Sequence, residues 1–246
     1  MRFLSLVALC AFVFCPGRAR ADVAVTTAVG RGADTYIRGG SFADTNFGGE
    51  ALALFNNAGP DLSQADKVYI RFDVSSLPRP ANDQDSLLKL VFPDTGMGDS
   101  TPDKLWQYNL WGLKDGPLDF WDEKTITWNN APGNDPTSAA GMNSDAIALA
   151  TLPITRSTSA TIGGDPIQRM LNTDTNGVIT FMISRATIAD AMNTYINGIA
   201  TKENSMFAAP TLSVPEPIAA GICGILFVLE ILKPRQRRYR AAVCAD

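Results

Sequence analysis

Alternating polar and apolar residues in the middle of the chain predict β-strands. From 67 to 74 every even position is apolar, and every odd position carries Lys, Tyr, Arg or Asp. Successive side chains of a strand point to opposite faces, so this segment predicts a half-buried strand with Val68, Ile70, Phe72 and Val74 inside. Similar runs, separated by Gly, Pro, Asn and Asp clusters, predict strands at 86–92, 104–111, 124–128, 146–152 and 178–184. Short strands at this spacing predict an all-β fold, a single β-sandwich or jelly roll.

One short helix is predicted between these strands. Asp165 is suited to cap the first turn, and Pro166 fits the first helical position. Ile167, Met170 and Leu171 then fall on one face. We expect this helix to close one end of the sandwich.

The first 21 residues have the pattern of a signal peptide. Arg2 precedes an almost wholly apolar run, 3–14, and Ala19-Arg20-Ala21 supplies small residues at the spacing that signal peptidase reads. The alternative is a short buried helix, which would lack a polar face. We predict cleavage after Ala21 and export of the remainder.

A second short apolar segment lies near the other end. Residues 218–232 are apolar or small except for Glu230, and five Lys or Arg residues follow between 233 and 240. Fifteen helical residues span about 22 Å, less than the ~30 Å hydrocarbon core of a bilayer. This hydrophobic helix therefore favours transient membrane insertion, with the basic tail on the cytoplasmic side.

Residues 214–240 resemble the PEP-CTERM sorting signal of Gram-negative bacteria. The order is Pro-Glu-Pro at Pro215, Glu216 and Pro217, then the apolar helix, then the basic tail. The resemblance implies recognition of Pro-Glu-Pro by an exosortase-type sorting enzyme. It also implies a membrane-inserted precursor that ends at the cell surface or in the extracellular matrix. The alternative is a plain C-terminal tail anchor.

The composition of the mature module, 22–213, excludes several chemistries. The chain has no histidine, and its four cysteines lie in the terminal segments, at 10, 15, 223 and 244. A Ser-His-Asp triad, a cysteine nucleophile, a thiolate or imidazole zinc site and a disulfide framework are therefore ruled out for the module. Residues 22–216 carry 13 Lys or Arg against 23 Asp or Glu, a net charge of −10. This acidic balance argues against nucleic acid as a partner.

Several segments together resemble the DNRLRE-type domains, which are related to carbohydrate-binding module family 96. The matching segments are 33–41 (ADTYIRGGS), 46–48 (NFG), 68–78 (VYIRFDVSSLP), 121–132 (WDEKTITWNNAP), 177–184 (GVITFMIS) and 210–214 (PTLSV). The resemblance implies a jelly-roll sandwich that binds polysaccharide, with acidic glycans such as alginate among the family's ligands. A uronate-binding module is expected to show a basic groove, whereas this one is net acidic. The ligand class stays open at this point.

Candidate sugar-binding residues are of two kinds. Arg38, Lys67 and Arg71 offer cations for an acidic sugar, and a guanidinium matches a carboxylate in bidentate geometry. The alternative for each Arg is pairing with a nearby carboxylate such as Asp34 or Asp73, which would hold a loop in place.

The four tryptophans lie between 106 and 128, and an aromatic ring can pack against a pyranose or fill a core. Trp106 and Trp111 are five positions apart, so on one strand they face opposite sides and one of them can be exposed. Trp128 shares the face of Ile126 and is predicted to be core, and Trp121 is predicted to be a hydrophobic plug.

A calcium clamp is the one metal site that the composition allows. Asp34, Asp44, Thr45 and Glu50 supply oxygens around a glycine-rich loop, and calcium takes six to eight oxygen ligands. The alternative is that these are solvated turn residues. We expect no other cofactor.

We interpret the chain as a non-catalytic exported protein whose single sandwich binds or scaffolds extracellular polysaccharide. A structural adhesin that binds no sugar is the first alternative. A polysaccharide lyase is the second, since lyases can work with Tyr, Arg, Lys and Asn. No Tyr and base pair stands out in this sequence, which disfavours the lyase.

Overall fold

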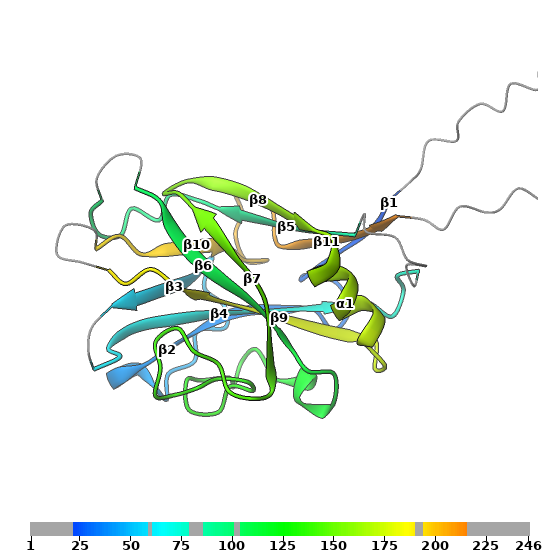
Figure 1. Ribbon diagram of the computed structural model, residues 1–246, viewed down its shortest axis with the longest axis horizontal. Coiled ribbons are helices and arrows are strands. Elements are labelled where there is room, and N and C mark those ends of the chain that lie inside the picture. The colour runs from blue at the N-terminus through cyan, green and yellow to red at the C-terminus, as the bar shows by residue number, and fades with distance from the viewer. Residues whose placement is uncertain (1–21, 59–60, 79–85, 101–103, 190–193, 216–246) are drawn as a thin grey trace, which may run out of the picture.

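The computed structural model describes residues 22–58, 61–78, 86–100, 104–189 and 194–215, which form a sandwich of two antiparallel sheets (Figure 1). The smaller sheet has the order β1-β11-β5-β8, and the larger has β10-β3-β4-β9-β6-β7, with β2 also paired to β4. The strands of the smaller sheet are β1 (Asp22–Thr26), β11 (Thr211–Pro215), β5 (Leu87–Phe92) and β8 (Thr158–Gly163). Those of the larger sheet are β10 (Asn197–Ala200), β3 (Leu52–Ala58), β4 (Gln64–Asp73), β9 (Val178–Arg185), β6 (Trp106–Leu113), β7 (Ala146–Ile154) and β2 (Ala33–Arg38). The predicted all-β sandwich is confirmed.

The main hydrophobic core fills the space between the two sheets. Phe72, Leu90, Tyr108 and Phe181 are among its members, each at most 1% exposed. Adjacent rings meet edge-on, as between Phe72 and Phe181, whose centroids are 6.2 Å apart. Burial of this apolar surface is the main source of the sandwich's stability.

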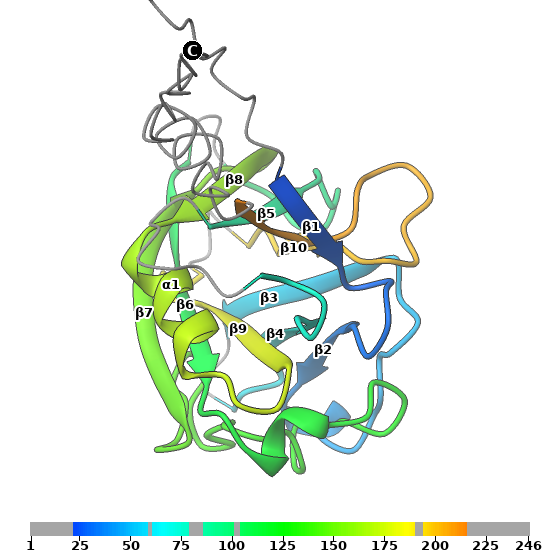
Figure 2. The ribbon, with the colours of Figure 1, turned by 90° about the vertical axis from the view of Figure 1, so that its right-hand side faces the viewer.

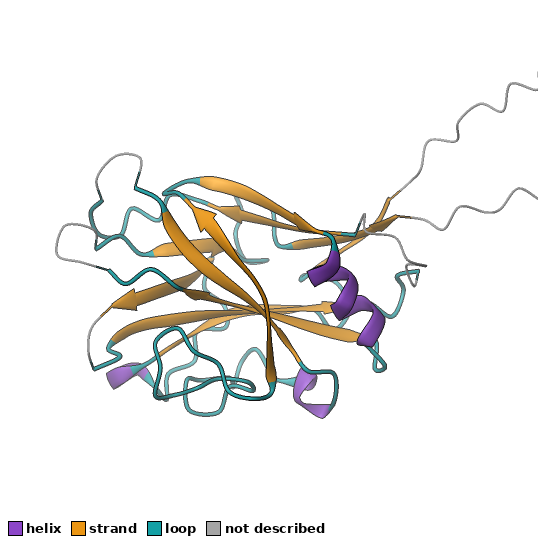
Figure 3. Cartoon of the chain, viewed as in Figure 1, coloured by secondary structure: helices purple, strands orange, loops and turns teal. Residues whose placement is uncertain are grey.

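The prediction that one face of the 67–74 strand is open to solvent is wrong. In β4 both faces are covered, because the long connection from β6 to β7, residues 114–145, folds over the outer face of the larger sheet (Figure 3). This connection, the covering loop, brings Trp121, Ile126 and Trp128 onto Tyr69 and makes a second small core. The alternation marked the two faces of the strand correctly but did not reveal that both are buried.

The predicted strand 124–128 is also wrong as a strand. Glu123–Thr125 and Trp128–Asn130 form turns inside the covering loop, and no ladder includes this segment. Ile126 and Trp128 are nevertheless both 2% exposed. Their apolar periodicity therefore reflects contact with the outer face of the sheet. The core position predicted for Trp128 and the plug predicted for Trp121 are confirmed.

The predicted helix is present as α1 (Asp165–Thr173), which closes one end of the sandwich beside β6 and β8 (Figure 1). Ile167, Met170 and Leu171 are buried as expected. The N-cap is Gly164, with φ of +79°, and Asp165 is the first helical residue. The cap prediction was thus wrong by one position. Two short 3-10 helices, η1 (Gly40–Phe42) and η2 (Pro117–Phe120), lie in the loops.

Three predictions concern residues outside the described part of the chain. These are the signal peptide 1–21, the apolar helix 218–232, and Glu216 and Pro217 of the sorting motif. Pro215 is described and is the last residue of β11. Among the described residues, no helix combines the length and apolar character needed to cross a membrane.

Candidate functional site

The Lys67 side chain lies inside the protein and does not face a surface groove. It is 0% exposed, and its Nζ donates to Asn134 Oδ1 at 2.7 Å, to the Asp135 carbonyl at 3.1 Å and to the Gly141 carbonyl at 2.6 Å. The ammonium also lies 4.5 Å from the centre of the Trp128 ring. Burial lowers its pKa to about 7. Lys67 therefore holds the covering loop on β4, and the prediction that it faces a glycan is corrected.

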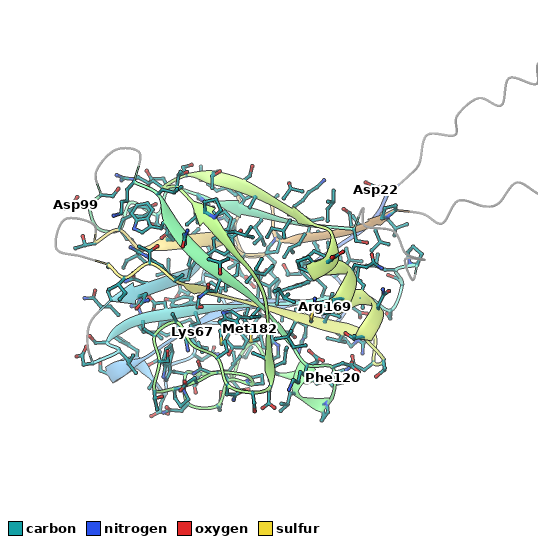
Figure 4. The ribbon with its side chains drawn as sticks, in the orientation of Figure 1. Asp22, Lys67, Asp99, Phe120, Arg169 and Met182 are labelled. Atoms are coloured by element: carbon teal, nitrogen blue, oxygen red, sulfur yellow. The ribbon has the colours of Figure 1, made fainter. Side chains whose placement is uncertain are left out.

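Figure 4 shows Lys67 close to Met182, between the larger sheet and the covering loop. Arg71, four residues further along β4, belongs to the same layer. Its Nε donates to the Arg31 carbonyl at 2.7 Å, its Nη1 to the carbonyls of Asp119 and Trp121, and its guanidinium covers the Trp121 ring at 4.9 Å. The Nε and Nη1 donors of Arg71 thus bind backbone oxygens, and these contacts fix the covering loop.

Arg38 forms an ion pair with Asp66, a partner that the sequence analysis did not name. Its Nε and Nη2 donate to Asp66 at 2.5 and 3.1 Å, and the Asp66 side chain is 0% exposed. The two residues are cross-strand neighbours in the β2–β4 ladder. Burial raises the pKa of Asp66, and Arg38 acts against that rise. The alternative reading, in which an Arg pairs with a carboxylate, describes Arg38, although its partner is neither Asp34 nor Asp73.

The rings of Tyr36, Phe42 and Phe47 surround the Arg38 guanidinium at 5.5 to 5.8 Å. Phe42 is 43% exposed and the Arg38 side chain 20%. Arg38 therefore keeps a partly accessible edge, while its main donors are engaged with Asp66.

Trp106 and Trp111 lie on opposite sides of β6, as the sequence predicts. Trp106 is 0% exposed in the main core, where it stacks on Tyr195 with a centroid distance of 5.4 Å. Arg185 lies 5.2 Å from the same ring. Trp106 cannot contact a glycan from this position, and its prediction as a binding residue is corrected.

Trp111 is the predicted binding aromatic that reaches the surface. It is half-buried, its ring packs beside the second core, and its Nε1 donates to Ser184 Oγ at 3.1 Å. The β6–β7 pairing shifts register between Leu110 and Trp111, so Leu149 of β7 is the extra residue, and such an irregularity increases the local twist.

A shallow hollow of about 290 Å³ opens at Trp111, on the outer surface of β6 and β7. Its lining residues come from these two strands: Asn109, Leu110, Trp111, Ala148, Leu149, Ala150 and Thr151. Thr151 Oγ1 donates to Asn109 Oδ1 at 2.8 Å across the ladder, where the two residues are partners. Because β7 is the edge strand of the larger sheet, one long side of this surface has no neighbouring strand in the described part of the chain. An aromatic ring beside an amide and a hydroxyl is an arrangement suited to a sugar ring.

The sequence did not identify Asn109, Ala148 or Thr151 as candidates. Asn109 stands two residues before Trp111 on one strand, so alternation alone places the two side chains on one face. The contribution of β7 depends on the β6–β7 register, which the tertiary structure sets.

The structure does not bring together the residues that were predicted to bind calcium. Among the described residues, the acidic side chains that gather within 4.8 Å of one another are Asp34, Glu123 and Glu203. Asp44 and Glu50 do not join this cluster, and Asp44 instead accepts a bond from Asn129 at 2.7 Å. Thr45 is exposed in the loop after η1.

Internal donors engage Asp34 and Glu123, whereas Glu203 Oε2 is buried without a hydrogen-bond partner among the described residues. Asp34 accepts from Thr27 Oγ1 and from the Lys202 amide, and Lys202 Nζ binds Glu123 Oε2 at 2.6 Å. Burial raises the pKa of Asp34 to about 7, and the charge of Glu203 adds to this rise. The Lys202 ammonium thus pairs with Glu123, one of the three carboxylates of the cluster.

Two facing antiparallel sheets with an aromatic hollow on one outer surface suit a sugar-binding domain. The model of carbohydrate-binding module family 96 matches residues 25–212, which is most of the chain. The protein belongs to this family and is a carbohydrate-binding module. A search of curated proteins gave no match to the sequence.

Proposed function

We propose that the protein is an exported, non-catalytic module that attaches to extracellular polysaccharide at the cell surface or in the matrix of a Gram-negative bacterium. The family match over 25–212 is the observation that carries the proposal. The half-buried Trp111 in its hollow supports it, because a partly exposed indole beside polar groups suits carbohydrate contact.

The route to the surface forms the second part of the proposal. Signal peptidase removes residues 1–21, the apolar helix 218–232 holds the precursor in the membrane, and an exosortase-type enzyme acts at Pro-Glu-Pro. The module has no histidine or cysteine, and this composition suits a domain that works outside the cell without disulfides.

Affinity electrophoresis tests the binding function. Residues 22–215 contain every described strand of both sheets, and this chain is run in gels that hold alginate, pectin or neutral glycans. We expect slower migration in at least one polymer than in a plain gel. Uniform migration in all gels favours the structural adhesin. Release of unsaturated uronate absorbance during incubation would make the protein a lyase.

A further inference from the structure

Among the described residues, no ionisable side chain lines the hollow at Trp111. The seven lining residues are one aromatic, one amide, one hydroxyl and four aliphatic residues. The three cations that the sequence offers for a uronate bind elsewhere: Lys67 and Arg71 hold the covering loop, and Arg38 pairs with Asp66. None of the three lines the hollow.

We propose that this hollow binds an internal stretch of a neutral polysaccharide, with a pyranose ring packed on Trp111; the inference rests on the proposed carbohydrate-binding function and specifies its ligand class. A sugar carboxylate that enters the hollow would lose hydrating water, and no cation there would compensate for this loss. Its transfer into the hollow would therefore carry a large desolvation cost. The net charge of −10 over residues 22–216 adds long-range repulsion of a polyanion. A neutral sugar meets neither penalty.

The fixed geometry of the hollow suits hydroxyl groups. The bond from Trp111 Nε1 to Ser184 Oγ holds the indole in one orientation, so binding does not have to order it. Asn109 Oδ1 accepts from Thr151, which leaves the Asn109 Nδ2 donor and the Thr151 oxygen lone pairs for sugar hydroxyls.

The shape of the hollow suits an internal segment of a polysaccharide and not only its end. A volume of about 290 Å³ is at the lower end of ligand sites, which suits a short stretch of a longer polymer. The hollow lies at an edge strand, so the rest of the chain can continue past β7 without a clash with a neighbouring strand.

Affinity electrophoresis and titration calorimetry with defined polymers test the ligand class. The full chain is prepared in a polyoxyethylene detergent, which carries no sugar. Neutral probes are soluble β-glucan, glucomannan and xylan, and acidic probes are alginate and polygalacturonate. We expect binding to at least one neutral polymer that changes less than about twofold between 0.05 and 0.5 M NaCl, because added salt screens charges and not stacking.

The substitution Ala148→Arg tests the location. Ala148 is exposed in the lining, so a long side chain there fills the hollow without entering either core. We expect at least about a tenfold loss of neutral-glycan affinity, since the added bulk clashes with the ligand. Ala28→Arg is the matched control. Ala28 is exposed in the β1–β2 turn, which lies on the side of the molecule opposite β7 (Figure 2), and we expect unchanged affinity.

Three outcomes would contradict this inference, each with a different consequence. Salt-sensitive binding to alginate or polygalacturonate without neutral binding would overturn the inference and leave the proposed function standing. Neutral binding that survives Ala148→Arg would overturn the assignment to the hollow. Failure to bind any of the five polymers would overturn the inference together with the carbohydrate-binding function from which it follows.

Discussion

Asp22 and Pro215 are directly opposite each other at the end of the β1–β11 ladder. Asp22 is the first residue after the predicted signal-peptidase site, and Pro215 is the first residue of Pro-Glu-Pro. The two described ends of the chain therefore leave the sandwich at the same end (Figure 1). The two proposed processing events act at neighbouring points of one folded module.

The pairing of β1 with β11 predicts that the N-terminal strand stabilises the C-terminal one. Val25 of β1 is 6% exposed, and Val23 packs against the main core. A chain that begins at Thr27 loses this burial and the five-residue ladder, which we expect to lower the free energy of unfolding by about 3–5 kcal/mol. Urea denaturation against residues 22–215 measures the difference. Equal midpoints would show that β1 contributes nothing to the fold.

Replacing Pro215, Glu216 and Pro217 by Ala is expected to leave the precursor in the inner membrane. The sorting enzyme is proposed to recognise these residues, and the apolar helix 218–232 would otherwise keep its hold on the bilayer. Cell fractionation with an antibody to the module follows the location. Pro153→Ala, in the exposed part of β7, is the control. Normal surface levels of the triple variant would refute the sorting role of the motif.

Lys67→Met is expected to loosen the covering loop. Loss of the ammonium leaves Asn134 Oδ1 and the carbonyls of Asp135 and Gly141 without this donor, at a cost of about 2–4 kcal/mol. Urea denaturation measures the cost, and amide hydrogen exchange shows whether 114–145 becomes less protected. Lys89→Met, at an exposed position of β5, should change both by little. Unchanged protection in the Lys67 variant would contradict its role in holding the loop.

The Arg38–Asp66 pair predicts a strong non-additive effect. Arg38→Ala leaves the fully buried Asp66 carboxylate without its cation, which is expected to cost about 3–5 kcal/mol. Adding Asp66→Asn removes the uncompensated charge, so the double variant should be more stable than Arg38→Ala alone. A double-mutant cycle from urea melts gives the coupling. Additive effects would mean that the two side chains do not interact.

The raised pKa of Asp34 predicts that the free energy of unfolding decreases as the pH rises. Its pKa is raised to about 7 in the folded protein against 3.8 for an ordinary Asp, so the folded state holds more protons between these values. This contribution is complete below about pH 4 and is lost through pH 7, with a slope of up to about 1.4 kcal/mol per pH unit. Urea melts at pH 4.5, 6 and 7.5 compare the protein with Asp34→Asn. We expect a flatter profile for the variant, and parallel profiles would assign the slope to other groups.

The elements with strong alternation were predictable, and those held by tertiary contacts were not. All of the predicted strand 67–74 except Val74 lies in β4, 178–184 lies in β9, and Ile167, Met170 and Leu171 are buried in α1 as expected. The segment 124–128 has the same alternation but forms turns, because its apolar side chains pack on the outer face of a completed sheet. Alternation indicates which side chains share a face and not whether the backbone joins a ladder.

The candidate site was likewise predictable from the sequence only in part. From the residues alone, the chain could be identified as a thiol-free and histidine-free all-β module with an acidic surplus, and Trp111 as one of two possible exposed aromatics, because composition and alternation are local properties. Only the tertiary structure decided that Lys67 and Trp106 are buried, that Arg71 holds the covering loop, and that Asn109 and Thr151 join Trp111 in an uncharged hollow. These facts depend on the covering loop and on the β6–β7 register, which join residues far apart in the sequence.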